Sequence, residues 1–207
     1  HLDEIGFMTT GIEQGFLRFI TVGGVDPRML PGRELTILTD PPVIGVITCL
    51  PPHVLSEEDM DKSFPVDELF IDTGLPHDEA VEKIPVGTPA VYRARCFPLG
   101  EDLFCGKAMD DRSCFCAGLL ALQQLQAHDL AHDVVLLGTT REETNFGGAK
   151  TGTFALNPDV GLALDVTGWG DTPETKLPAV KLGEGPAVKI MDRSMIATPW
   201  VRDKLFE

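Results

Sequence analysis

The sequence predicts an α/β fold: a partial α/β sheet layer, interrupted near its start by a β-rich, barrel-like module. Residues 5–100 contain many short β-type segments separated by Gly and Pro, as in a small barrel or sandwich. The second half instead alternates a helical pattern with nearly continuous apolar runs, which are typical of strands buried on both faces. We therefore expect the α/β domain over residues 1–7 and 105–207, and the inserted module over residues 8–104.

Within the inserted module, apolar and β-branched residues form short runs bounded by turn residues. Residues 78–84 break this pattern and predict a short helix, because their first turn is acidic. The predicted strands are residues 16–22, 34–39, 43–48, 66–72 and 90–95.

The second half has the spacing of a βαβ unit. Residues 113–127 carry apolar side chains three or four positions apart, which predicts an amphipathic helix. The apolar runs 133–139 and 160–166 predict buried parallel strands, and residues 148–156 between them predict a helix. We expect residues 1–3 to form another strand of this layer, from which the chain leaves for the inserted module.

Bulk properties narrow the classes of function. The formal net charge of −15 argues against nucleic acid or an anionic membrane as the main partner. No apolar run of about 18 residues is present, so no membrane span is expected. The five cysteines lack Cys-x-x-Cys spacing, which predicts buried free thiols in a reducing, cytoplasmic compartment. Because the chain opens in a strand pattern and closes within a helical one, we expect a fragment of a longer protein.

Acidic residues follow both predicted strands of the βαβ unit. Glu142 and Glu143 come shortly after the first strand, and Asp165 lies at the end of the second. In an open α/β sheet, ligands bind at the carboxyl ends of the strands, so these carboxylates would share one edge. Each carboxylate alone would be interpreted as a solvated surface residue, and only their joint placement favours a ligand-binding site.

Two further places add candidate ligands. Asp110 and Asp111 stand where the helix over 113–127 begins, and the ordinary interpretation of such a pair is an N-cap. His1 and Asp3 are two apart on a predicted strand, so their side chains share a face. A carboxylate beside a metal-bound imidazole fixes the tautomer of the ring. One His among several carboxylates suits two ions of the Zn, Co or Mn type, with a spare Glu as general base.

Four motifs occur along the chain in the order of residues 1–8, 106–112, 140–143 and 164–167. Together they resemble the motifs of the tetrahedral (TET) aminopeptidases, which are dinuclear metallopeptidases related to glutamyl aminopeptidase; some have been called endoglucanases. The resemblance runs over nearly the whole chain, and residues 23–28 also look like a family segment. It implies a peptide substrate and a homo-oligomer, a tetrahedral dodecamer in which the β-rich module is the dimerisation domain.

The resemblance also implies roles for individual residues and two divalent ions per subunit, zinc or cobalt. Asp110 would bridge the two ions, and its peptide bond to Asp111 would be cis. Glu142 would be the general base, and Asp3 would orient His1. A further His ligand belongs to a later motif that this chain does not contain. The metal ligands within the chain would be His1, Asp110, Glu143 and Asp165.

The prediction is therefore a metal-dependent aminopeptidase that removes the N-terminal residue of peptides. One alternative is a glycoside hydrolase, an endoglucanase, which needs two carboxyl groups but neither His1 nor a metal. A second alternative is an assembly subunit that keeps the fold without turnover. The preferred N-terminal residue and the native metal are not readable from the motifs.

Overall fold

The computed structural model describes residues 1–54, 56, 62–175 and 180–207, and divides into two compact units. The first unit, His1–Asp165, holds every residue predicted for the site. The second unit, Val166–Glu207, contains an isolated β-bridge between Met191 and Ile196 and ends in helix α5 (Pro199–Leu205). Among the described helices, none combines the length and apolar character that a membrane crossing requires.

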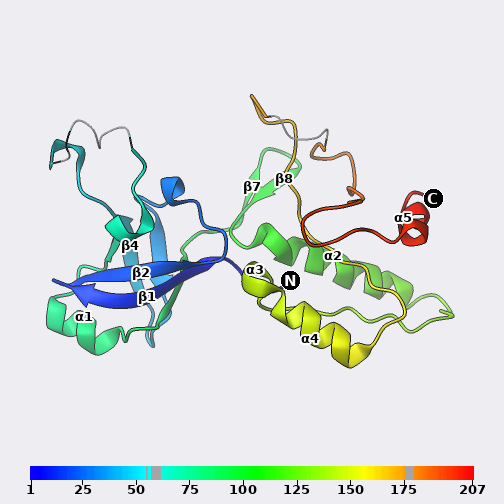
Figure 1. The fold of residues 1–207 in the computed structure, drawn as a ribbon, viewed down its shortest axis with the longest axis horizontal. Helices are drawn as coiled ribbons and strands as arrows, with labels where there is room; N and C mark the ends of the chain where they lie inside the picture. Colours follow the sequence, from blue (N-terminus) through cyan, green and yellow to red (C-terminus); the bar gives the residue numbers. More distant parts are fainter. Residues whose placement is uncertain (55, 57–61, 176–179) are drawn as a thin grey trace. The chain divides into compact units, whose positions relative to one another are not determined.

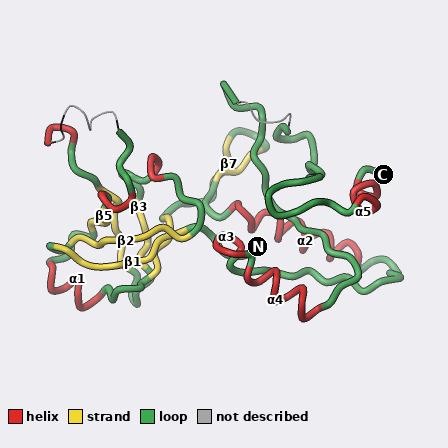
Figure 2. Tube along the Cα trace, in the orientation of Figure 1, coloured by secondary structure: helices red, strands yellow, loops and turns green. Residues whose placement is uncertain are grey.

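Six antiparallel strands close into a barrel in the order β1-β2-β5-β4-β3-β6 (Figures 1 and 2). This confirms the β-rich, barrel-like part of the predicted fold, although the domain limits 8–104 stay a prediction. The strand predicted over residues 66–72 is shorter than expected, because its first half forms a 3-10 turn, Val66–Glu68. The strands are β1 (Gly6–Glu13), β2 (Phe16–Val22), β3 (Glu34–Ile37), β4 (Val43–Thr48), β5 (Phe70–Asp72) and β6 (Pro89–Tyr92).

The barrel encloses its own apolar core. Alternate residues of β2 point inward, so Leu17 and Phe19 are buried whereas Phe16 and Ile20 are exposed. Phe7 of β1 meets Phe19 edge to face, with ring centroids 5.4 Å apart. Helix α1 (His77–Lys83), which matches the helix predicted over 78–84, buries Ala80.

The second half of the first unit is mainly helical. Helix α2 (Met109–Leu125) and helix α4 (Gly147–Leu156) confirm the helices predicted over 113–127 and 148–156. A four-residue helix, α3 (Glu142–Asn145), was not predicted and carries both glutamates that were expected in a loop. The hairpin of β7 (Phe97–Leu99) and β8 (Leu103–Cys105) was also not predicted.

Residues 133–139 run between α2 and α4 as an extended segment. A β-carbon added at Gly118 of α2 would lie 2.8 Å from Leu136, and one added at Gly152 of α4 would lie 2.6 Å from Leu137. The neighbouring side chains of Leu136 and Leu137 therefore face opposite helices, although Val135 and Leu137 stay exposed. Glycine at these two helix positions lets the segment approach both helices closely.

The predicted parallel sheet, however, is not present among the described residues. Residues 133–139 and 160–166 form no strand, and Figure 2 shows strands only in the barrel and the β7–β8 hairpin. Residues 1–3 are not a strand either, although Leu2 N donates to Thr139 O at 2.8 Å. A strand requires paired N–H and C=O groups along its neighbours, and apolar runs alone do not supply them.

The cysteine prediction was half right. All five cysteines are free thiols, but none is buried: Cys96, Cys105 and Cys116 are exposed, and Cys49 and Cys114 are half-buried. Cys96 and Cys105 belong to the hairpin region, whose strands β7 and β8 are exposed throughout, and Cys116 faces outward from α2. The exposure of each thiol therefore depends on how its helix or strand packs, and cysteine as a residue type does not predict it.

Candidate metal centre

The structure brings all six predicted site residues into one cluster from four separate segments. Two groups of three place their ligand atoms within 4.8 Å of one another: His1 with Glu142 and Asp165, and His1 with Asp110 and Glu143. Figure 1 shows the start of the chain beside α3, which brings His1 to the two glutamates. This grouping differs from the ligand sets implied by the resemblance, since Glu142 stands with His1 and Asp165.

His1 is held so that one ring nitrogen faces the carboxylates. Its side chain is only 2% exposed, and Nδ1 lies 3.1 Å from the carbonyl oxygen of Asp3 and 3.3 Å from Asp3 Oδ1. Both neighbours are acceptors, so a neutral imidazole would keep its proton on Nδ1 and present the lone pair of Nε2 to the carboxylates. Nε2 lies 3.1 Å from Asp110 Oδ1 and 3.4 Å from Glu142 Oε2. With the Nε2 lone pair in that direction, a divalent cation between Nε2 and these two carboxylate oxygens would be bound by all three groups.

Asp3 connects this histidine to the two glutamates. Its Oδ1 accepts the backbone N–H of Glu142 at 3.2 Å, and its Oδ2 accepts the N–H of Glu143 at 3.3 Å. These N–H groups lie at the start of α3 and have no partner within the helix. The helix begins after Arg141, whose backbone is left-handed, at φ 60°. Asp3 therefore positions the start of α3 as well as the imidazole, and the first of these contacts was not predicted.

The Asp110–Asp111 pair does not act as an N-cap. No side chain caps the start of α2, and both aspartates have non-helical backbone angles. The bond between them is cis, which confirms that prediction. Asp111 is buried, and its Oδ2 lies 2.6 Å from the main-chain nitrogen of His1. Its other oxygen, Oδ1, has no hydrogen-bond partner among the described residues.

Negative charge dominates the cluster. Burial, followed by the charges of Asp110 and Glu142, raises the pKa of Glu143 to about 7. Burial and nearby carboxylates also raise the pKa values of Asp110 and Glu142. Carboxylates that repel one another in this way are stabilised when a cation lies between them. The charge pattern therefore agrees with the geometry in favouring a metal site.

Glu4 anchors the segment that carries His1. Its Oε1 lies 3.0 Å from Lys107 Nζ and 3.5 Å from Arg112 Nη2. Arg112 Nε also donates to the carbonyl oxygen of Leu2 at 3.2 Å. These contacts hold residues 1–4 against the start of α2. Neither Glu4 nor its partners were predicted. A signal was present in the sequence, since Lys107 and Arg112 both lie within the motif over residues 106–112.

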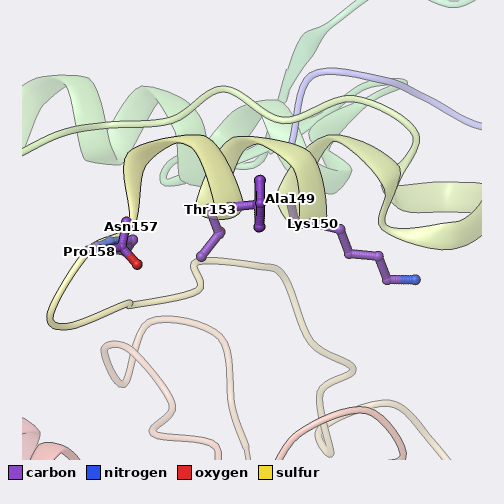
Figure 3. A pocket seen from close by; sticks show the side chains of 6 residues that line it. Ala149, Lys150, Thr153, Asn157 and Pro158 are labelled. Atoms are coloured by element: carbon purple, nitrogen blue, oxygen red, sulfur yellow. The ribbon is translucent and has the colours of Figure 1, made fainter.

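Two other features lie outside the cluster's chemistry. A hollow of about 570 Å³ runs along α4 (Figure 3), and none of its lining residues belongs to the cluster. The side chains that line it are Ala149, Lys150, Thr153, Phe154, Asn157 and Pro158.

Burial and the neighbouring carboxylate of Asp111 raise the pKa of the Cys114 thiol to about 12, so this thiol stays protonated at neutral pH.

Comparison with known protein families gives a match over the whole chain. The sequence model of the M42 glutamyl aminopeptidase family matches residues 1–207. A putative aminopeptidase of Acetivibrio thermocellus is 36% identical over 209 residues, covering 100% of this chain and 60% of the relative. The lysyl aminopeptidase of Pyrococcus furiosus is 32% identical, covering 92% of this chain and 56% of the relative. The chain thus spans less than two thirds of either relative.

Solved structures give the same result for the fold. A TET aminopeptidase from a marine sediment archaeon of the Thaumarchaeota superposes with a TM-score of 0.91 at 30% identity, covering 100% of this chain and 60% of that chain. The TET1 peptidase of Pyrococcus horikoshii, which can assemble into a tetrahedron or a large octahedral shell, superposes with a TM-score of 0.80 at 33% identity. In that case 100% of this chain and 62% of the other are covered.

Proposed function

Because the chain belongs to the M42 glutamyl aminopeptidase family, we propose that it carries the general base and four of the metal ligands of a metal-dependent aminopeptidase. Such an enzyme hydrolyses the bond after the N-terminal residue of a peptide. The observation that carries the proposal is the geometry around His1, whose Nε2 faces Asp110 Oδ1 at 3.1 Å and Glu142 Oε2 at 3.4 Å. This donor set suits zinc or cobalt better than a cation that prefers oxygen alone.

We assign His1, Asp110 and Asp165 to one cation, and Asp110 with Glu143 to a second. Two divalent cations, when bound, supply Lewis acidity toward the peptide carbonyl and lower the pKa of water. The assignment leaves Glu142 as the carboxylate that moves protons. Its closeness to His1 and Asp165 supports this role, because a general base must lie within reach of the reacting water.

The proposed chemistry of the chain's own residues is a proton transfer in two stages. The carboxylate of Glu142 takes a proton from the water as that water attacks the first peptide carbonyl. Glu142 then gives the proton to the nitrogen of the next residue, which leaves as an amine when the C–N bond breaks. In the metal-free cluster, burial and the nearby carboxylates raise the pKa of Glu142. Asp3 keeps the imidazole of His1 and the start of α3 in place throughout.

The partners proposed are a peptide substrate and further copies of the chain. The barrel, within residues 8–104, is proposed as the dimerisation domain, and a tetrahedral dodecamer as the assembly. The support is the fold shared with a TET1 peptidase that can assemble into a tetrahedron or a large octahedral shell. Light scattering coupled to size-exclusion chromatography tests this assembly, and a strictly monomeric protein at working concentration would exclude it. A cytoplasmic location remains a prediction.

Removal and return of metal separates the proposal from its rivals. Turnover of an aminoacyl anilide is expected to disappear after treatment with EDTA and to return with Zn²⁺ or Co²⁺. A glycoside hydrolase with two catalytic carboxyl groups would cleave a β-glucan and survive EDTA. A catalytically silent assembly subunit would cleave neither substrate, even after metal is added.

A further inference from the structure

Gly23 lies where the barrel meets the proposed metal centre. The β1–β2 ladder ends in the pair Gly6–Val22, so Gly23 continues directly opposite Ile5. Its φ of +83° is in the left-handed region. A β-carbon built at Gly23 would lie 2.7 Å from Cγ2 of Ile5, 3.2 Å from Cβ of Glu143 and 3.3 Å from Oε2 of Glu143. The bare backbone of the barrel therefore packs against a proposed metal ligand.

We propose that Gly23 is a positioning residue that fixes the place of the Glu143 carboxylate. This inference rests on the proposed function, in which Glu143 binds the second cation. Helix α3 has only four residues, and the residues at both of its ends, Arg141 and Phe146, are left-handed, at φ 60° and 58°. So short a helix gains little rigidity from its own hydrogen bonds, and its side chains depend on outside contacts. The hydrogen bond from Glu143 N to Asp3 holds the backbone of α3, and Gly23 bounds the Glu143 side chain.

The barrel offers a matched glycine that lacks this contact. Gly32 has nearly the same φ, +81°, but a β-carbon there would meet no atom within 4 Å. Alanine at Gly32 therefore reports only the strain of a left-handed residue. Alanine at Gly23 adds to the same strain a collision with Ile5 at 2.7 Å and tight contacts with Glu143 at 3.2 and 3.3 Å. The difference between the two variants isolates the contact with the metal centre.

The test compares Gly23→Ala with Gly32→Ala in the purified protein, with Zn²⁺ binding measured by calorimetry and the absorption spectrum of bound Co²⁺. We expect Gly23→Ala to weaken binding of the second cation by about 10–100-fold, the usual cost of disturbing a residue that orients a ligand. The Co²⁺ spectrum should change with it. Gly32→Ala should bind both ions and give the spectrum of the wild type. A folded Gly23→Ala protein with wild-type affinity and spectrum would overturn the proposal.

A double variant covers the case in which Gly23→Ala does not fold. Ile5→Ala with Gly23→Ala removes the collision at 2.7 Å and leaves the contacts with Glu143 at 3.2 and 3.3 Å. With Ile5→Ala as its reference, the double variant should fold like Gly32→Ala and still bind the second cation more weakly. Restored binding would show that Gly23→Ala strains only the end of the β1–β2 hairpin, and this result would also overturn the proposal.

Failure of this inference can be told from failure of the proposed function. A wild-type protein that binds two cations but cleaves no aminoacyl anilide would contradict the function, and a loss of the second cation in Gly23→Ala would still support the role of Gly23. An active wild-type protein whose Gly23→Ala variant binds both cations normally would contradict only the role of Gly23.

Discussion

The barrel and the metal-centre segments belong to one compact unit but are held together in different ways. In the barrel, inward side chains such as Leu17, Ile37 and Ile71 are completely buried. In the other half, Val135 and Leu162 are 63% and 62% exposed, and Phe154 on α4 is 89% exposed. Apolar burial therefore stabilises the barrel, whereas charge contacts and capping hydrogen bonds organise the site. This difference predicts that mutations in the two regions will affect different observables.

The largest effect is expected from Glu142→Gln. The amide cannot take a proton from water, and general acid–base catalysis contributes about 10²–10⁴-fold to rate. Cation binding and the barrel should be nearly unchanged, because Gln keeps the shape of Glu and the main-chain hydrogen bond to Asp3. The kcat of an aminoacyl anilide assay measures the loss. A variant that kept more than about a tenth of wild-type kcat would show that another group moves the proton.

The next prediction tests whether apolar burial stabilises the barrel. Leu17→Ala removes a completely buried side chain from β2 and is expected to cost about 2–5 kcal/mol in the free energy of unfolding. Leu162→Ala, at an exposed position of the other half, should change stability by no more than about 0.5 kcal/mol. Urea denaturation measures both variants. Equal losses would mean that the two halves share one apolar core.

A smaller effect tests the ionic anchor of the site half. Glu4 faces both Lys107 and Arg112 and is mostly buried, so Glu4→Gln should cost about 1.5–3 kcal/mol. The matched control is Glu13→Gln, which breaks an exposed pair with Arg18 and should cost at most about 1 kcal/mol. Hydrogen exchange of the Leu2 amide, which donates to Thr139 O, should speed up only in Glu4→Gln. An unchanged Leu2 exchange rate would exclude the anchoring role.

The smallest effect is a pH dependence of the metal-free protein. In the folded state the pKa of Glu143 is raised to about 7 from an ordinary 4.5. Below pH 4.5 the group is protonated in both states, so its contribution to stability is fully present. Between that pH and about 7 the unfolded state gives up the proton first, so stability falls as pH rises. Thermal unfolding from pH 5 to 8 should show this slope, and Glu143→Gln should reduce it. A slope that is identical in both proteins would assign the effect to other groups.

The sequence by itself determined the elements whose pattern is local. Alternation, helical spacing and nearby turn residues were enough to predict two strands, over 16–22 and 43–48, and the helix over 148–156. The order of the motifs gave the family, and with it the six residues that the structure gathers into one cluster. Five of the six barrel strands could be predicted in this way, whereas β1 (Gly6–Glu13) was not among the predicted strands.

Only the tertiary structure decided which distant groups meet. Asp3 accepts a hydrogen bond from Glu142 N across 139 positions, and Gly23 lies so close to Glu143 that an added β-carbon would be 3.2 Å from its Cβ. Tertiary structure also decided that residues 133–139, despite a clear strand pattern, lie between helices without a ladder. The physical reason is the same in each case. A local pattern specifies the conformation and the apolar face of a segment, but hydrogen bonds and contacts across the chain depend on which segments the fold places side by side.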